Sequence, residues 1–346
     1  MRILLCSHFF HPSVGGIEHV SLMLATEFEH AGHEVKVITT TLESDRQRFL
    51  FGIVRRPSPA RLIKLVQWSD VVFHNNISLR MWWPLLIVRR PWVIAHHTWI
   101  ARTDSSVGLR DRIKRYLARF ATNIAISQPI ADHLSVSSTI IGNPYRDELF
   151  RRDSSAKRER DLIFVGRLVP DKGVDILFNA LKRLKERDFF PCLSVVGNGP
   201  DLHRLSKLVQ QFGLRDQVKF LGTKTGHDLV LELNRHRVIV VPSRWQEPFG
   251  LVALEGVACG CRAIIADSGG LREAAGPLAV VFEHESDLAL AEAIERTLKE
   301  PFDWQGYWRT MEDHLRTHGA SEVGRRYLEV LAESSLARTF RKATRP

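Results

Sequence analysis

Apolar and polar positions follow two different periods along the first half of the chain. Short apolar runs have the length and composition of buried strands. These runs are 2–7, 34–40, 70–74, 91–97 and 122–127. Between the first two runs, apolar side chains recur at the spacing of one helical face. They are Ile17, Val20, Leu24, Phe28 and Ala31, and Gly32 follows where the helix should end. Alternating strands and helices predict a parallel sheet covered on both faces.

The same alternation starts again in the second half of the chain. The segment 151–160 is polar and charged throughout, and it is typical of a linker between domains. The apolar runs that follow it are 161–166, 192–197, 217–221, 237–241, 262–266 and 279–282. A helix is expected over 172–185 between the first two of them. A chain of 346 residues is long enough for two cores, so we expect two domains, 1–150 and 151–329.

Composition narrows the class of protein. With 44% apolar and 25% charged residues, the chain has the composition of an ordinary globular protein. It contains no apolar run of 18 residues, and its N-terminus lacks the pattern of a signal peptide. The four cysteines, Cys6, Cys192, Cys259 and Cys261, have neither disulfide-framework nor zinc spacing. These features predict free thiols, no metal site and a cytoplasmic location.

The net charge of +10 is concentrated in one stretch. Between Arg46 and Arg119 there are 15 Lys/Arg and three acids, which gives 15 − 3 = +12. Such an excess is compatible with nucleic acid, a membrane surface or a polyanionic substrate. The chain contains none of the aromatic motifs of RNA-binding modules, so we expect no nucleic-acid partner.

Candidate chemistry gathers after the strands of the second half. In open parallel sheets, ligands bind beyond the carboxyl ends of the strands. The loops expected there contain Gly166, Arg167, Lys172, Gly197, Asn198, Gly199 and the segment 243–250. Two cations, several glycines and a carboxylate suit a phosphorylated ligand that carries hydroxyls. The Gly-Asn-Gly triplet lacks the third glycine of a dinucleotide fingerprint and is equally compatible with a simple turn.

Two carboxylates are separated by a loop and one helical turn. Glu247 lies in the loop, and Phe249, Gly250 and Leu251 would present backbone N–H groups at a helix N-terminus, where a diphosphate is favoured. Glu255 lies in an otherwise apolar helix, so its carboxylate needs hydrogen-bond donors. The hydroxyls of a ribose would supply them, and a salt bridge to Arg262 is the structural alternative.

These segments together resemble a known family. EPFGLVALE at 247–255 is similar to the signature of retaining glycosyltransferase family 4, which has the GT-B fold. VGRLVPDKG (165–173), VVGNGPD (195–201), FLGTKTGHDL (220–229), PSVGGIEHV (12–20) and ISQPIADHL (126–134) match further family segments in the same order. The resemblance covers nearly the whole chain. It implies two Rossmann-like, doubly wound parallel-sheet domains facing across a cleft, joined by a C-terminal helix over 330–346.

The resemblance also implies roles for individual residues. Arg167 and Lys172 would bind the diphosphate of a nucleotide sugar, Glu255 the ribose and Glu247 the transferred sugar. Gly15, Gly16, Gly166, Gly197, Asn198, Gly199, Phe249, Gly250 and Leu251 would line the donor site. His97 would lie at the reaction centre together with Glu247, Arg167 and Lys172, although His96 is an alternative to it. No cofactor and no metal are implied, and the chain has no Asp-x-Asp pair.

Two other classes of function compete with sugar transfer. One is a GT-B sugar-nucleotide epimerase, which would need further acids in the cleft. The other is a non-enzymatic basic protein that binds nucleic acid or a membrane. The segment 79–92, LRMWWPLLIVRRPW, places Trp82 and Trp83 close to Arg89 and Arg90, as an interfacial anchor requires. This segment predicts peripheral binding to the inner leaflet and a glycan or lipid-linked acceptor, unless its apolar residues belong to the core.

Overall fold

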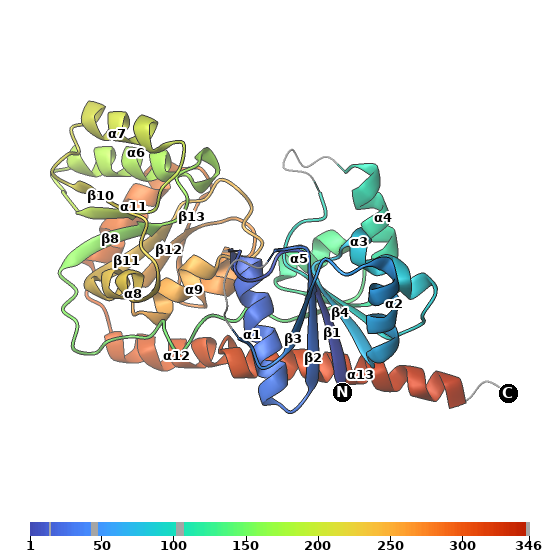
Figure 1. The fold of residues 1–346 in the computed structure, drawn as a ribbon. Helices are drawn as coiled ribbons and strands as arrows, with labels where there is room; N and C mark the ends of the chain where they lie inside the picture. The colour runs from blue at the N-terminus through green and yellow to red at the C-terminus, as the bar shows by residue number, and fades with distance from the viewer. Residues whose placement is uncertain (14, 43–47, 102–106, 344–346) are drawn as a thin grey trace. The chain divides into compact units, whose positions relative to one another are not determined.

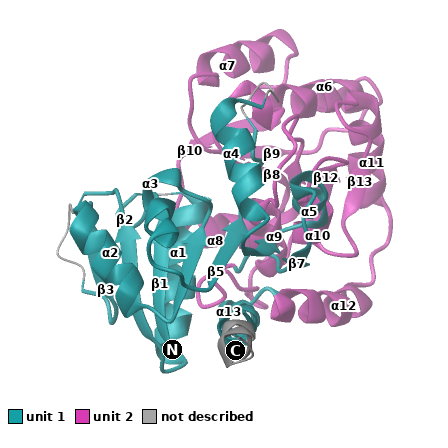
Figure 2. Cartoon of the chain, turned by 90° about the vertical axis from the view of Figure 1, so that its right-hand side faces the viewer, with its two compact units in different colours: residues 1–144, 318–346 teal, residues 145–317 magenta. Residues whose placement is uncertain are grey.

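The computed structural model describes residues 1–13, 15–42, 48–101 and 107–343. The chain forms two compact units (Figure 2). Unit 1 comprises Met1–Pro144 and His318–Pro346, and unit 2 comprises Tyr145–Thr317. Each unit has its own parallel sheet with helices around it (Figure 1). The chain therefore has the α/β fold class expected from its sequence, with two Rossmann-like parallel-sheet domains.

The sheet of unit 1 has seven strands in the order β3-β2-β1-β4-β5-β6-β7, and neighbouring strands are parallel. The strands are β1 Arg2–Ser7, β2 Glu34–Thr39, β3 Gly52–Arg55, β4 Val71–Asn75, β5 Trp92–His96, β6 Thr122–Ala125 and β7 Ser138–Ile140. The helices are α1 Gly16–His30, α2 Pro59–Trp68, α3 Leu79–Trp82, the 3-10 helix η1 Trp83–Leu86, α4 Leu109–Ala118, α5 Gln128–Leu134 and α13 Ala320–Ala343.

Helix α1 forms as its apolar spacing predicts. Val20, Leu24 and Phe28 are completely buried, and the Phe28 ring lies 6.1 Å from the ring of Phe73 on β4. The helix ends at a left-handed Gly32, with φ of 81°, whose N–H donates to Glu29 O. The expected span of 17–32 therefore differs from the observed one only at its ends.

The sheet of unit 2 has six strands in the order β10-β9-β8-β11-β12-β13, again with parallel neighbours. The strands are β8 Arg160–Val165, β9 Leu193–Val196, β10 Val218–Gly222, β11 His236–Val241, β12 Arg262–Ala266 and β13 Val280–Phe282. The helices are η2 Pro170–Lys172, α6 Val174–Lys185, α7 Leu202–Gln211, α8 Gly226–Arg235, α9 Leu251–Ala258, α10 Leu271–Ala275, α11 Asp287–Lys299 and α12 Trp304–Thr317. Strand order reverses between β8 and β11, which is where such sheets bind ligands.

The structure differs from the sequence-based expectation in three places. Strands β3 and β7 were not predicted, because each is short and lies at an edge of the sheet. The segment 151–160 is not a free linker: the Arg158 guanidinium donates to His236 O at 2.7 Å and to Cys259 O at 2.6 Å within unit 2. The unit boundaries also lie at 144 and 317, rather than at 150 and 329.

The return of the chain to unit 1 explains the second boundary. Helix α13 packs against α1 and against strands β4 and β5. The Tyr327 side chain is fully buried, with its ring 5.7 Å from that of Phe73. Arg326 donates to Ile140 O at 2.8 Å. Val323 and Leu331 complete this apolar stripe, so the joining helix begins about ten residues before the expected start at 330.

Candidate functional site

Two loops at the carboxyl edge of the unit 2 sheet are bonded to each other. The loop after β8 places the Asp171 carbonyl where it accepts from the backbone N–H of Arg244, at 2.9 Å, and of Trp245, at 3.1 Å. Arg244 comes from the loop after β11, and its guanidinium also binds Asp175 through two hydrogen bonds of 2.7 and 3.0 Å. The edge is therefore preorganised by backbone and charge-assisted contacts.

Lys172 and Glu247 meet at this edge. The Lys172 Nζ lies 2.5 Å from the Glu247 Oε1, and the Ser243 hydroxyl donates to the same oxygen at 2.8 Å. The Glu247 backbone is also held, because its carbonyl accepts from Gly270 N at 2.8 Å. No described residue hydrogen-bonds the second carboxylate oxygen, Oε2. The pair therefore presents a fixed cation and a fixed acceptor side by side.

Arg167 lies on the same loop as Lys172 but makes different contacts. Its side chain is exposed, and no described residue pairs with it. The loop after β8 therefore contains both predicted cations. Lys172 is already paired with Glu247, whereas the Arg167 guanidinium is available to bind a ligand. An available guanidinium at a strand end suits a phosphate, whose oxygens it can bind in a bidentate manner.

The Gly-Asn-Gly triplet after β9 has a packing reason for its glycines. A Cβ on Gly197 would lie 1.8 Å from Gly166 O, and one on Gly199 would lie 2.2 Å from Leu168 O. Leu168 N in turn donates to Asn198 O at 2.9 Å. The loops after β8 and β9 therefore cross at a distance that only glycine allows. Close packing of the two loops is thus sufficient to explain the two glycines, as the interpretation of the triplet as a simple turn requires, and no ligand is needed.

The segment before α9 turns sharply into the helix. Gly250 has φ of 111°, a conformation that favours glycine, and it precedes the first helical residue, Leu251. Phe249 is buried, with 2% of its surface exposed. The Ala253 N–H donates to Gly250 O at 2.9 Å, so the N–H groups of Leu251 and Val252 form the candidate anion-binding position at the start of the helix. This is the arrangement expected for a diphosphate next to Lys172.

Glu255 lies one turn into α9 and is not part of an ion pair. Arg262 instead donates to Thr297 O at 2.7 Å and covers the Phe302 ring at 3.7 Å, so the alternative pairing of Glu255 with Arg262 is wrong. Burial raises the pKa of Glu255 to about 7, and the charge of Arg146 partly opposes this. No described residue hydrogen-bonds its carboxylate. By accessible surface Glu255 is half-buried, so this acid without a protein donor is open to a ligand that donates hydrogen bonds, which is typical of a binding site.

Unit 1 has its own cavity at the carboxyl edge of its sheet, with a volume of about 670 Å³. Residues from the ends of β1, β4 and β5 and from the start of α4 line it. They are His8, Phe9, Ile17, Glu18, Asn75, Asn76, Ile77, Ser78, Leu79, Arg80, His96, Thr98, Trp99, Ile100, Arg110 and Lys114. Burial lowers the pKa of His8, and the charges of Arg80 and Lys114 lower it further. The cavity is therefore basic, with Glu18 as its acid.

The two adjacent histidines differ in their surroundings. His96 lines the cavity, and its Nε2 lies 2.9 Å from the Asn123 Oδ1. His97 lies beside the cavity, with its backbone N–H donating to Asn76 Oδ1 at 2.8 Å. Burial lowers the pKa of His97 to about 3, and neither ring nitrogen has a hydrogen-bond partner of good geometry among the described residues. Of these two adjacent histidines, His96 is the one that lines the unit 1 cavity.

The glycine loop of unit 1 reaches the same edge. Helix α1 begins at Gly16, directly after Gly15, and the residues that follow, Ile17 and Glu18, line the cavity. A Cβ on Gly15 would lie 2.3 Å from the flexible carboxylate of Glu18. Val14, also in the predicted glycine loop, lies outside the described residues. Both glycines are thus next to the basic cavity.

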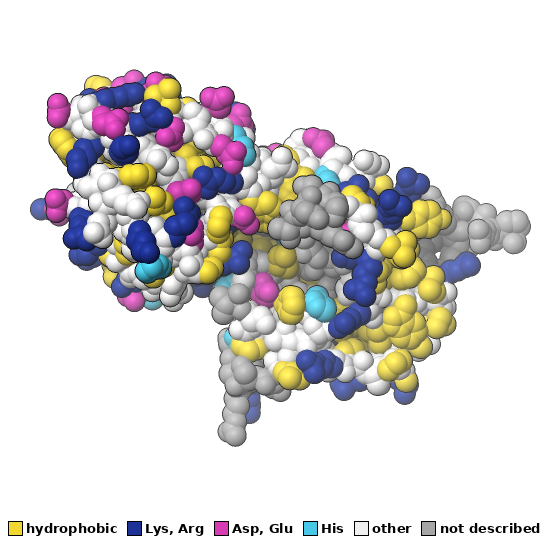
Figure 3. Space-filling view, turned by 90° about the horizontal axis from the view of Figure 1, so that it is seen from above, with side chains coloured by type: hydrophobic (Ala, Val, Ile, Leu, Met, Phe, Trp, Pro, Cys, Tyr) yellow, Lys and Arg dark blue, Asp and Glu magenta, His cyan; other side chains and the backbone are white. Residues whose placement is uncertain are grey.

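The segment 79–92 is only partly exposed. Trp82 and Trp83 are half-buried, and Trp82 packs on Trp92 with ring centroids 6.1 Å apart. Arg90 donates to Val66 O at 3.1 Å and to Gln67 O. Trp82, Trp83 and Arg90 are therefore integrated into the fold, and the exposed apolar residues of the segment are Leu86 and Ile87. Figure 3 shows hydrophobic and basic side chains next to one another on a face of unit 1.

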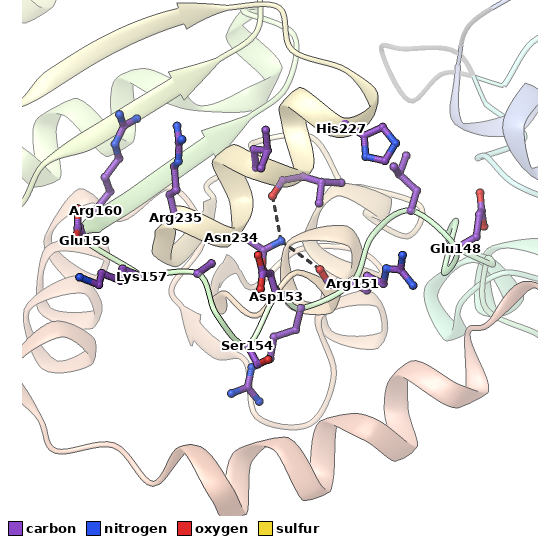
Figure 4. A pocket seen from close by; sticks show the side chains of 15 residues that line it. Glu148, Arg151, Asp153, Ser154, Lys157, Glu159, Arg160, His227, Asn234 and Arg235 are labelled. Atoms are coloured by element: carbon purple, nitrogen blue, oxygen red, sulfur yellow. Dashed lines mark hydrogen bonds between the residues drawn. The ribbon is translucent and has the colours of Figure 1, made fainter.

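Unit 2 also has a cavity of about 850 Å³ that residues outside these loops line (Figure 4). The segment 148–160 and helix α8 line it. Arg160 and His236 begin β8 and β11, so this cavity lies at the amino edge of the sheet, opposite the edge where ligands bind. Arg160 is paired with Glu232, and Asp153 accepts from Ser155. Size alone therefore does not identify the site.

Sequence reasoning missed several of these residues. The basic lining of the unit 1 cavity by His8, Arg80, Arg110 and Lys114 was not predicted, since these residues come from the loop after β1 and from helices α3 and α4, which are far apart in the sequence. Its one local signal is the spacing of Arg110 and Lys114, four residues apart on a helix. The pairing of Lys172 with Glu247 joins residues 75 positions apart and has no local signal.

Comparison with known proteins identifies the family that the second unit matches. Residues 146–312 match the model of the family described as glycosyl transferases group 1. D-inositol 3-phosphate glycosyltransferase from Salinispora tropica is 31% identical over 250 residues, which cover 68% of this chain and 50% of that protein. The second unit therefore matches the glycosyl transferases group 1 over nearly its whole length, and the curated relatives that the chain resembles are glycosyltransferases.

Solved structures agree in fold over nearly the whole chain. A glycosyltransferase from Rickettsia africae has a TM-score of 0.76 at 15% identity, covering 96% of this chain and 98% of that one. Anabaena HepE, solved in complex with UDP and glucose, has a TM-score of 0.73 at 18% identity, covering 95% and 99%. In sequence, the chain spans about half the length of the first curated relative that it matches.

Proposed function

We propose that this protein is a retaining glycosyltransferase that moves a sugar from a nucleotide-diphosphate sugar to a glycan, lipid-linked or small-molecule acceptor. The observation that carries the proposal is the Lys172–Glu247 pair next to the start of α9, with the unpaired Glu255 one turn further on. Cation, helix N-terminus and two carboxylates match the diphosphate, ribose and sugar of one ligand. The Anabaena protein of similar fold was solved with UDP and glucose, which supports a UDP- or related donor.

Each donor-site residue has a role in this proposal. Arg167 and Lys172 stabilise the departing diphosphate, helped by the N–H groups at the start of α9. Glu255, protonated or ionised near neutral pH, hydrogen-bonds the ribose hydroxyls. The Oε2 of Glu247 accepts from a hydroxyl of the transferred sugar, while Lys172 and Ser243 hold Oε1. Gly166, Gly197, Asn198 and Gly199 shape the loops, and their close packing supports a positioning role.

The chemistry needs little beyond positioning and charge stabilisation. We propose hexosyl transfer on the same face of the sugar, without a cofactor and without a metal. Among the described residues, no three His, Cys, Asp or Glu side chains gather as metal ligands would. The diphosphate charge would then be neutralised by Arg167, Lys172 and the helix amides.

The acceptor side of the proposal involves unit 1. Its basic cavity suits an acceptor with negative charge, and His96 or His97, with Gly15 and Gly16, would line the reaction centre from that side. We propose a cytoplasmic enzyme of polysaccharide biosynthesis that works at the inner leaflet. No helix in the described part of the chain combines the length and apolarity needed to cross a bilayer. Contact with anionic lipid through the segment 79–92 would rest on Arg89, Leu86 and Ile87, which are exposed, more than on Trp82 and Trp83.

A binding panel tests the donor assignment. The melting temperature should rise with one of the UDP-, GDP- or ADP-sugars, because a ligand that binds the folded state stabilises it. Calorimetry with the free nucleotide diphosphate should then show weaker binding in Glu255→Gln and unchanged binding in Glu247→Gln. Glu247→Gln should instead reduce transfer. No stabilisation by any nucleotide sugar, or equal loss of nucleotide affinity in both variants, would contradict the assignment.

A further inference from the structure

Helix α4 of unit 1 has apolar side chains on its outer face. Leu109, Ile113 and Tyr116 are 75%, 39% and 58% exposed, and Phe120, in the turn that follows, is 64% exposed. Their spacing of four, three and four residues puts them in one stripe along the helix. The rings of Tyr116 and Phe120 pack edge to face at 5.3 Å. Leu117 and Ala118 are the buried residues of α4, so the stripe is a second apolar surface, exposed in the part of unit 1 that the structure describes.

Arginines flank this stripe and acids are nearly absent from it. Arg112 and Arg119 are exposed on its side, and Arg110 is exposed on the opposite flank. The one acid of the helix, Asp111, accepts from Gly108 N at 3.1 Å and so belongs to the helix start. We define the docking face as Leu109, Arg112, Ile113, Tyr116, Arg119 and Phe120. Its charge is complementary to an anionic surface.

We propose that the docking face of α4 binds the surface of an anionic lipid bilayer. Interfacial helices combine an apolar stripe that enters the acyl boundary with cations that meet the lipid headgroups. Tyr116 and Phe120 supply aromatic rings at the depth where such rings are favoured. This surface is separate from the segment 79–92, and it has four exposed apolar side chains in one line.

The position of α4 gives the docking face a consequence for the acceptor. Arg110 and Lys114, on another flank of the same helix, line the basic cavity of unit 1. Arg112, Arg115, Tyr116 and Arg119 border a second hollow of about 320 Å³, wide enough for a phosphate headgroup. Docking would therefore present the cavity at the lipid surface. The role of the cavity in binding an acceptor at the lipid surface rests on the proposed transfer to a lipid-linked acceptor. The binding of α4 to the bilayer does not depend on that proposed function.

Vesicle co-sedimentation of the full chain, without donor or acceptor, tests the docking face. We expect binding to phosphatidylglycerol-containing vesicles at low salt, weaker binding at high salt, and none to pure phosphatidylcholine. Ile113→Asp with Phe120→Asp should weaken binding by roughly tenfold or more, since two apolar contacts are lost and negative charge is added. Phe190→Asp is the matched control, because Phe190 is 56% exposed in unit 2. It should bind as the unmodified protein does.

A second pair of variants separates charge from apolar contact. Arg112→Gln with Arg119→Gln should weaken binding by roughly tenfold and flatten its salt dependence. Lys207→Gln with Arg215→Gln, exposed cations of unit 2, should change neither. Absence of binding to anionic vesicles at low salt, or equal loss in the controls, would overturn the proposal. So would gel filtration showing a dimer that Ile113→Asp dissociates, because a second copy would then cover the stripe. Nucleotide-sugar binding measured in the same variants reports on the donor site separately.

Discussion

The two units share a sheet topology but differ at the edge where each would bind a ligand. Unit 1 repeats the order of unit 2, with the first strand of each sheet between the second and the fourth. In unit 2 the edge is held by loop-to-loop bonds, such as Lys172–Glu247 and Arg244–Asp175. In unit 1 the edge surrounds a basic cavity and contains buried histidines with lowered pKa values. A fixed edge suits one common ligand, whereas a cavity lined by separate loops suits a ligand that varies among relatives.

The largest effect is expected where the unit 2 loops cross. Gly197→Ala places a methyl group against Gly166 O at a φ of 141°, so one of the two loops must move. We expect a loss of about 3 kcal/mol or more in the free energy of unfolding. Gly222→Ala, at a φ of 66° with open space around it, controls for backbone conformation alone and should lose about 1 kcal/mol. Urea unfolding measures the free energy of unfolding of both variants. Equal losses in the two would show that the loops after β8 and β9 have room for a methyl group where they cross.

A pH-dependent effect is expected at Glu255. Its pKa of about 7 lies above the ordinary 4.5, so the folded state holds more protons than the unfolded state between these values. Stability from this group is therefore present at low pH and is lost as pH rises through the window. Glu255→Gln should remove that slope and raise the free energy of unfolding at pH 8 by roughly 1–3 kcal/mol. Thermal unfolding from pH 4.5 to 8 tests this, and a variant less stable at pH 8 would contradict it.

Most of the fold was predictable because its signals are local. Eleven apolar runs became strands, since a buried parallel strand is a continuous apolar segment. Strands β3 and β7 were missed because an edge strand is short and half-exposed, and it lacks that signal. The start of α13 was misplaced, although Val323 and Tyr327 already belong to its buried stripe.

The candidate site was predictable only as a set of residues. Strand-end position brought Arg167, Lys172, Glu247 and the start of α9 to one edge, as expected. Their pairings were not predictable, because Lys172 and Glu247 meet only when two crossovers have folded. The unit 1 cavity was missed for the same reason, since helices α3 and α4, which are distant in the sequence, contribute its cations.

Lys172 and Arg167, the two cations at the edge of the unit 2 sheet, should differ in their effect on stability, and this effect is smaller than those above. Lys172→Ala should lower turnover by well over tenfold, because it removes a phosphate contact and leaves the buried Glu247 carboxylate without its cation. Arg167→Ala should also lower turnover by over tenfold but leave stability unchanged, since its side chain is exposed. Steady-state kinetics with the identified donor, together with melting temperatures, tests both variants. Normal turnover in either one would remove that residue from the donor site.

Little change in stability is expected at His97, although it lies in the buried part of unit 1. The Asn143 side chain partly opposes the lowering of the His97 pKa, but neither ring nitrogen has a hydrogen bond of good geometry among the described residues, so His97→Leu removes a largely unsatisfied polar group. We expect the free energy of unfolding at pH 8 to stay within about 1 kcal/mol, or to rise, while transfer falls by at least tenfold if the imidazole serves the reaction.

His74 provides the matched comparison for that prediction. Its Nδ1 accepts from Trp92 Nε1 at 2.6 Å, so His74→Leu leaves a buried indole N–H unpaired and should destabilise unit 1 by about 1–3 kcal/mol at pH 8. Burial lowers the pKa of both histidines to about 3, so each folded ring binds fewer protons than its unfolded counterpart below pH 6.5. Stability from both is therefore lost as pH falls below that value, and either variant should weaken this acid dependence. At pH 8 both rings are neutral in the folded and the unfolded state, so the difference between the two variants there reports their hydrogen bonds without a contribution from protonation. If His97→Leu lost as much stability at pH 8 as His74→Leu, the imidazole of His97 would be a structural group, and the edge of unit 1 would be as closely bonded as that of unit 2.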